Sequence, residues 1–373
     1  MNKSLFLILA MLIFIAGCSS SDDSNGTGDN TDNFDRKALL TNIADNIVIP
    51  SYQSFSNDIT ALKTATSGFI TTTDAANLIA LRNAWIKAYT SWQSVSMFEI
   101  GKAEELSLRN FMNVYPVTVA EIESNITSGT YDFTSVTKQD EQGFGALDYL
   151  LNGLSGTDIG IVEFYTTNAN AAGYKKYLTD LVNRMNNLTD EVLNDWKGSY
   201  RGTFISNSGS SATSSVDKLT NDFIFHYEKH LRAAKIGIPA GVFSGSPLDN
   251  TVEAFYKTDI SKTLFNANLN ALQDFFNGKH FGSTTTGESL KTYLDFLNTI
   301  KDGADLSTLI NNQFNTARTK ASSLDDDFSS QVRTNNSLMT QTYDELQKNV
   351  VFLKVDMLSA LSIRVDFVDA DGD

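Results

Sequence analysis

The segment Asp74–Trp92, DAANLIALRNAWIKAYTSW, shows most clearly which fold this chain adopts. Asp74 suits a helix N-cap, because an aspartate side chain accepts a hydrogen bond from the free backbone amides of the first helical turn. Apolar residues then recur every three or four positions, which places them on one face of an α-helix. This face comprises Leu78, Leu81, Trp85, Ala88, Tyr89 and Trp92, and it continues to Met97 and Phe98. The segment therefore predicts a long helix with one buried side.

The same spacing recurs along most of the chain, and only four prolines occur in 373 residues. Long intervals without proline allow long helices. The pattern predicts helices over residues 34–55, 74–98, 116–126, 145–152, 171–196, 216–235, 251–276, 288–301, 306–323 and 337–355. We therefore expect an all-α fold.

The helical part is longer than one hydrophobic core usually organises. The polar stretch 206–215, SNSGSSATSS, has the composition of a connection between two halves. The sequence therefore predicts two packed helical-bundle subdomains, an N-terminal one over 34–205 and a C-terminal one over 206–373.

Residues 1–18 have the features of a lipoprotein export signal. The apolar run Leu5–Ala16 is too short to span a bilayer, and it overlaps the cleavage box Ile15–Cys18. We expect cleavage before Cys18, lipid on that cysteine and a flexible polar tether over 19–33. Ser19 after the cysteine resembles the outer-membrane sorting pattern. The predicted location is the outer membrane, facing the periplasm or the cell surface, with the acylated Cys18 in the lipid.

The formal net charge is −15 at pH 7. A strongly acidic surface repels the phosphates of nucleic acids and of anionic lipids, so no nucleic-acid partner is expected. Cys18 is the only cysteine. The chain therefore offers no disulfide framework, and no thiolate for catalysis or metal binding once Cys18 carries lipid.

Several separated segments resemble one family. They are LRNFMNVYPV at 108–117, GFGALD at 143–148 and KIGIPAG at 235–241. In this order they are similar to segments of the imelysin family, the bacterial M75 peptidases, whose motif is G-x-H-x-x-E. The resemblance implies the imelysin scaffold, with the motif segment near the junction of two helical subdomains. Relatives with the full motif are linked to iron uptake, haem-related systems or metal-dependent proteolysis.

The chain departs from the family pattern at the ionisable positions. Gly145 stands at the motif histidine and Asp148 at the motif glutamate. Many relatives also carry W-E-x-x-E, where this chain has Gln93 and Ser96 after Trp92. A histidine and a glutamate three apart on a helix share a face and can hold a metal or act in acid–base catalysis, whereas glycine offers no ligand. We therefore expect no catalytic residues.

The main functional expectation is a lipid-anchored imelysin-like protein that binds a ligand rather than cleaving a peptide. The ligand would be iron or haem, and the partners would be components of an iron or haem uptake system. The predicted ligand cleft is lined by Trp92, Gln93, Ser96, Phe98, Gly145, Asp148 and Tyr149.

Two alternatives remain open. His226 and His230 stand four apart on a predicted helix, so their imidazoles could hold zinc or iron if a carboxylate joined them. This pair would serve a metallopeptidase with non-standard ligands, or it could lie on a polar helix surface with no role. The other alternative is a surface platform that binds a partner protein without a small ligand.

Overall fold

The computed structural model describes residues 32–367. The predicted export signal with Cys18, nearly all of the predicted tether and residues 368–373 lie outside the described residues. The described residues from Phe34 onward belong to one compact unit. Regular structure in the described part is helical except for a two-stranded antiparallel pair, β1 (Ile300–Lys301) and β2 (Ala304–Asp305). The predicted all-α fold is confirmed, while the subdomain boundary at residue 206 stays a prediction.

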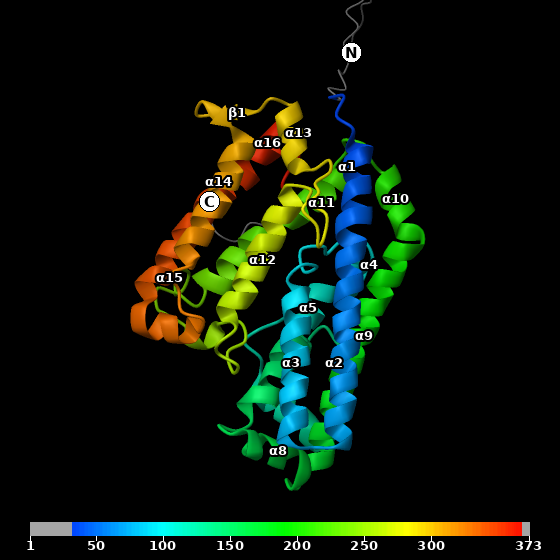
Figure 1. Cartoon of the computed structure of the whole chain (residues 1–373), viewed down its shortest axis with the longest axis vertical. Coiled ribbons are helices and arrows are strands. Elements are labelled where there is room, and N and C mark those ends of the chain that lie inside the picture. The colour runs from blue at the N-terminus through cyan, green and yellow to red at the C-terminus, as the bar shows by residue number, and fades with distance from the viewer. Residues whose placement is uncertain (1–31, 368–373) are drawn as a thin grey trace, which may run out of the picture. The chain divides into compact units, whose positions relative to one another are not determined.

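Helices α2 (Ile49–Thr71), α3 (Ala75–Trp92) and α9 (Ala171–Asp195) are the longest elements of the first half, and α2 packs against both others. Figure 1 shows α2 and α3 side by side. Asp74 caps α3 as predicted, because its side chain accepts a hydrogen bond from the Asn77 amide at 2.8 Å. The predicted apolar face of α3 is buried. No helix within residues 32–367 is both long and apolar enough to cross a membrane.

The second half contains α12 (Ser261–Phe276), α14 (Leu306–Ala321) and α15 (Phe328–Val350). Helix α15 packs against α14 and against the π-helical segment η5 (His226–Gly237), and α12 contacts α14, η5 and α3. Helix α12 thus connects the two groups of helices (Figure 1).

The smaller elements link these long helices. They are α1 (Arg36–Asn42), α4 (Lys102–Leu106), α5 (Leu108–Met112), α6 (Val119–Ser128), η2 (Gln139–Glu141), α7 (Gly143–Asp148), α8 (Asp158–Thr166), α10 (Arg201–Ser206), α11 (Ser215–Phe225), η6 (Asp249–Thr251), α13 (Leu290–Phe296) and α16 (Leu358–Ala360).

The helix predicted over 251–276 begins only at Ser261. Residues 252–259, which we call the junction loop, form turns instead. Ala254 and Thr258 have φ angles of 58° and 64°, which are incompatible with a right-handed helix. The local apolar pattern therefore does not decide the backbone conformation of this segment.

Several segments in the described part are π-helical, a geometry that is rare in proteins and frequent at functional sites. They are η1 (Ile43–Val48), η3 (Tyr149–Gly153), η5 (His226–Gly237) and η7 (Val351–Met357). A further segment, η4 (Trp196–Tyr200), is a kink with non-helical backbone at Gly198. Segment η3 directly follows the GFGALD segment, and η5 carries the histidine pair. Both therefore lie where the sequence places candidate chemistry.

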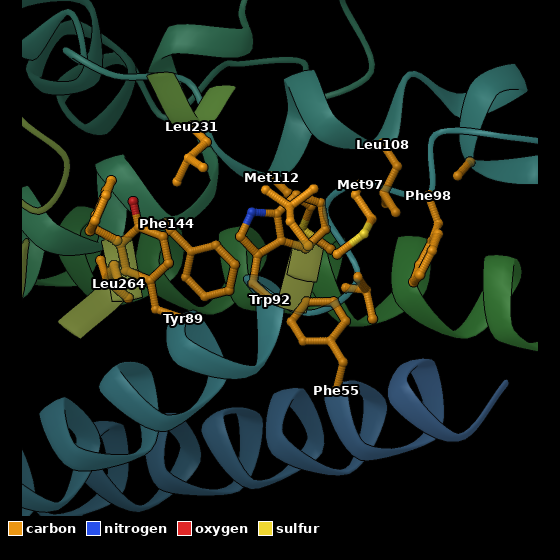
Figure 2. Packing of buried hydrophobic residues seen from close by; sticks show 14 of the residues in the cluster. Phe55, Tyr89, Trp92, Met97, Phe98, Leu108, Met112, Phe144, Leu231 and Leu264 are labelled. Carbon is orange, nitrogen blue, oxygen red and sulfur yellow. The ribbon is translucent and has the colours of Figure 1, made fainter. Parts of the chain in front are cut away.

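Aromatic rings anchor α7 in the core, as Figure 2 shows. Phe144 stacks on Tyr89 with ring centroids 4.4 Å apart and planes 3° apart, and it lies 6.2 Å from Trp92. Phe55 of α2 adds a tilted contact to Trp92 at 5.5 Å. The aromatic stripe of α3 is therefore core, and it fixes the position of α7.

Gly143 is a strict requirement at the start of α7, and this can be tested. Its φ is 74°, and a Cβ there would lie 2.3 Å from the Met112 carbonyl oxygen. Gly143→Ala should therefore lower the free energy of unfolding by about 2–4 kcal/mol. Gly68→Ala is the control, because Gly68 lies in the last turn of α2, where a Cβ meets no atom within 4 Å, and it should stabilise by up to about 1 kcal/mol. Urea unfolding followed by tryptophan fluorescence measures both; similar changes in the two variants would contradict the expectation.

Candidate functional site

Helix α7 carries the GFGALD segment and is buried at every residue. Gly145 lies against the backbone of the chain segment 114–117. A Cβ on Gly145 would lie 2.8 Å from both the Val114 carbonyl oxygen and Val117 Cγ1, closer than real Cβ contacts. Any side chain at this position therefore requires a neighbouring segment to move.

Asp148 joins α7 to the junction loop. Its Oδ2 accepts a hydrogen bond from the Tyr256 backbone amide at 2.8 Å, and its Oδ1 accepts one from Asn152 Nδ2 at 3.1 Å. The residue is only 2% exposed, and burial raises the pKa of its carboxyl to about 7 although the Tyr256 amide opposes the rise. Both carboxylate oxygens thus have structural partners.

A pocket of about 130 Å³ lies beside this joint, and its lining includes Pro116, Gly145, Asp148 and Tyr256. Sites for drug-sized ligands usually have volumes of about 300 Å³ or more. The pocket at the GFGALD segment therefore has room for only a small group.

A second, small cavity is lined by the two histidines. Three predicted ligand residues also line it, namely Trp92, Gln93 and Ser96. We call this cavity the histidine chamber; its volume is about 20 Å³, roughly the space of one water. His226 Nε2 lies 3.3 Å from Ser96 Oγ and 3.2 Å from Asn268 Oδ1, while its buried Nδ1 has no hydrogen-bond partner among the described residues. The His226 and His230 rings stack with centroids 5.2 Å apart.

Burial lowers the pKa of both imidazoles well below the usual range, and the positive charges of Arg109 and Lys235 lower it further. Both rings are therefore neutral at physiological pH. Burial also lowers the pKa of Lys235, which forms an ion pair with Glu253 of the junction loop. Glu253 Oε1 accepts further hydrogen bonds from Gln93 Nε2 at 3.2 Å and Asn113 Nδ2 at 2.8 Å. The chamber wall is thus a hydrogen-bonded network of buried polar groups.

The interpretation of the histidine pair as part of a polar helix surface is wrong. His226 is only 2% exposed, because η5 packs against α11, α12 and α15. Protein zinc sites use three or four side-chain ligands. Within residues 32–367, no three His, Cys, Asp or Glu side chains form a group that could hold a metal ion. Together with the lack of space at Gly145, this means that the described residues do not fit the metal centre of the full family motif.

The predicted ligand residues do not face one cleft. Phe98 lies beyond the end of α3 and lines a third pocket between α3 and α12. Tyr149 donates a hydrogen bond to Glu123 Oε1 at 2.6 Å, and its ring contacts Tyr256 at a centroid distance of 5.4 Å. Successive residues of a helical turn point in different directions, so residues that are neighbours in the sequence can line different pockets.

Several residues of the histidine chamber and its network were not predicted. Arg109, Asn113 and Lys235 stand in segments 108–117 and 235–241, so the family resemblance contained a signal for them. Glu253 and Asn268 have no local signal, because packing alone brings them within hydrogen-bond distance of the lining residues Gln93 and His226.

The profile of the imelysin (peptidase M75) family matches residues 48–354, most of this chain. This chain belongs to the imelysin family. The family resemblance is therefore confirmed, and the departures at Gly145, Asp148, Gln93 and Ser96 are departures within the family.

Solved structures show the same fold at low sequence identity. An imelysin-like protein from Psychrobacter arcticum 273-4 has a TM-score of 0.69 and 17% identity, covering 89% of this chain and 97% of that one. A putative iron-regulated protein A precursor from Parabacteroides distasonis ATCC 8503 has a TM-score of 0.67 and 18% identity, covering 85% and 94%. A curated relative, "Iron-regulated protein A" from Synechococcus elongatus (strain ATCC 33912 / PCC 7942 / FACHB-805), is 28% identical over 120 residues. That match spans 31% of this chain and about a third, 33%, of the relative.

Restoring the imelysin histidine should damage the fold rather than create a site. In Gly145→His the Cβ meets Val114 and Val117 at 2.8 Å, so we expect the free energy of unfolding to fall by about 1–3 kcal/mol or more. Urea unfolding gives the change, and metal analysis of the same variant tests for a gained ion. The expectation would be contradicted by a variant that is as stable as the wild type and gains stoichiometric zinc. Segment 114–117 would then move aside at little cost.

The raised pKa of Asp148 predicts a pH-dependent stability. The carboxyl has a pKa of about 7 in the fold and about 4 in an unfolded chain, so the folded state binds more protons between these values. Its contribution to stability is therefore complete below about pH 4 and is lost as the pH rises through 7. Asp148→Asn removes this titration. Relative to the wild type, the variant should gain at least about 1 kcal/mol between pH 5 and pH 8.

Urea unfolding at pH 5, 6.5 and 8 measures this gain. Asp158→Asn is the matched control, because the Asp158 side chain is 43% exposed and pairs with Arg82. A constant difference between Asp148→Asn and the wild type across this range would contradict the expected titration.

Proposed function

We propose that this protein is a lipid-anchored, non-catalytic imelysin-family protein that binds a ligand in iron or haem acquisition. The observation that carries the proposal is the state of the family motif. Position 145 has no room for a side chain, and the Asp148 carboxylate holds the Tyr256 amide and Asn152. Both motif positions on this helix thus have structural roles in this chain.

The iron context comes from the relatives. A curated relative is named as an iron-regulated protein, and so is one solved structure of the same fold. A shared scaffold supports a shared physiological setting, although activity depends on the residues of the site. We propose iron or haem as cargo and components of an uptake system as partners.

The proposed setting is the outer membrane, with the acylated Cys18 as anchor, facing the periplasm or the cell surface. The cleavage box Ile15–Cys18 and Ser19 support this location. An acidic chain with a net charge of −15 also favours cationic cargo over nucleic acid.

A second candidate function rests on the histidine chamber. His226 and His230 are brought together as neutral imidazoles, the form that ligates metal, and His226 Nδ1 is buried without a hydrogen-bond partner in the described part. A metallopeptidase with non-standard ligands would place its ion here. This candidate needs a third ligand that the described His, Cys, Asp and Glu residues do not provide.

One experiment separates the two candidates. The purified protein is exposed to iron, to zinc and to haem, and bound metal and haem absorption are measured for the wild type, Asp148→Ala and His226→Ala. His280→Ala is the matched histidine control, because His280 lies outside the histidine chamber. Circular dichroism confirms that each variant is folded. We expect iron or haem to be retained by Asp148→Ala and His226→Ala, and no hydrolysis of a peptide library.

Stoichiometric metal that disappears only in His226→Ala, together with peptide hydrolysis by the wild type, would replace the proposal with the peptidase. Binding of neither iron nor haem by the wild type would remove the acquisition role.

A further inference from the structure

The largest of the pockets described above lies between α3 and α12 and has a volume of about 360 Å³. This volume falls within the range of small-molecule sites, from about 300 to 1,000 Å³. We call it the α3–α12 pocket. It shares no lining residue with the smaller pocket beside Gly145 and Asp148 or with the histidine chamber. The residues at the imelysin motif positions therefore do not indicate which ligand this pocket binds.

One wall of the α3–α12 pocket is a loop that polar contacts hold in place. The Phe281 amide donates a hydrogen bond to the Asn46 carbonyl at 2.8 Å. Asn42 Nδ2 donates to the carbonyls of Gly278 and Glu288 at 3.1 and 3.0 Å. The wall is thus formed in the free protein, which lowers the entropic cost of binding.

Aromatic and sulfur-containing side chains line the pocket on its apolar side. Met97, Phe98 and Phe275 are each only 1% exposed, and the two phenylalanine rings meet edge to face at 5.6 Å. Phe281 is 38% exposed on the loop. These groups favour an apolar or aromatic body, and phenylalanine faces also attract cations.

The pocket also holds a carboxylate with a replaceable partner. The Asp58 side chain is 10% exposed, and within the described residues its one ionic partner is Lys87, with Asp58 Oδ1 and Lys87 Nζ 3.0 Å apart. The Lys87 side chain is 73% exposed. Ion pairs with so exposed a lysine contribute little, so another cation can displace Lys87 at small cost while the carboxylate stays in place.

Three of the hydroxyl groups that line the pocket are available as acceptors rather than donors. Ser51, Thr90 and Ser91 each donate their proton to a backbone carbonyl of their own helical region, at 2.8 to 3.0 Å. Their remaining hydrogen-bonding capacity is the oxygen lone pairs. A ligand rich in N–H donors therefore suits this side of the pocket.

We propose that the α3–α12 pocket binds a small amphipathic amine, with the ammonium on Asp58 in place of Lys87 and the apolar body against Phe98 and Phe275. The acidic chain, with its net charge of −15, raises the local concentration of such cations. This proposal is independent of the proposed iron or haem role. If no amine binds, the outcome of the metal and haem experiment is unaffected.

The test uses 2-phenylethylamine, with 2-phenylethanol as the neutral analogue and 3-phenylpropionate as the anionic one, in calorimetric titrations of the purified protein. The amine should bind at least about tenfold more tightly than the alcohol, because a hydrogen-bonded charge is worth that much. The propionate should not bind.

Variants assign the effect to the carboxylate. Asp58→Asn should lose at least about tenfold in amine affinity. Lys87→Gln removes the competing cation and should tighten amine binding roughly two- to fivefold. Asp158→Asn, which changes an acid outside this pocket, should leave affinity unchanged.

Four outcomes overturn the proposal: equal binding of amine and alcohol, unchanged amine affinity in folded Asp58→Asn, unchanged or weaker amine binding in Lys87→Gln, or no amine binding by either the wild type or Lys87→Gln. The Lys87 side chain is exposed, so Lys87→Gln keeps the test decisive even if Asp58→Asn fails to fold.

Discussion

The hydrogen bond from the Tyr256 amide to the buried Asp148 carboxylate is the contact on which the arrangement of the site depends. It joins a helix of the first half to a loop of the second half, more than one hundred residues later in the chain. The junction loop fixed in this way also carries Glu253, which accepts hydrogen bonds from Gln93 and Asn113 and pairs with Lys235. One loop thus links the motif helix to the histidine chamber.

The buried charges around the histidine chamber explain why its geometry is specific. Arg109 pairs with Asp222 at 2.8 Å, with side chains 7% and 13% exposed, and Arg109 Nε also donates to the Ser96 carbonyl at 2.9 Å. Removing such charges from water is costly, so each must keep its partner or leave an unpaired charge in the interior. The network therefore holds Ser96 in place, and Ser96 in turn contacts His226. Rigidity here is a consequence of polar burial.

This chain keeps the imelysin fold, and the residues at its motif positions make structural contacts. Helix α7 is held in the core by the stacking of Phe144 on Tyr89 and by the close approach of Gly143 to Met112. The space next to Gly145 is filled by Val114 and Val117, and the Asp148 carboxylate accepts a structural hydrogen bond. The pockets described above are separate, and the α3–α12 pocket, at about 360 Å³, is the largest of them.

The sequence by itself determined the helical fold, the cap and buried face of α3, the family, and the lack of a metal-ligating side chain at position 145. These are properties of neighbouring residues, so periodicity and motif comparison suffice to read them. Only the tertiary structure decided that residues 252–259 form a loop, that Ser96 and Phe98 line different pockets, and that Glu253 and Asn268 belong to the site. Those facts depend on how helices far apart in the chain pack against each other, and no local pattern of residues encodes the positions that such packing brings together.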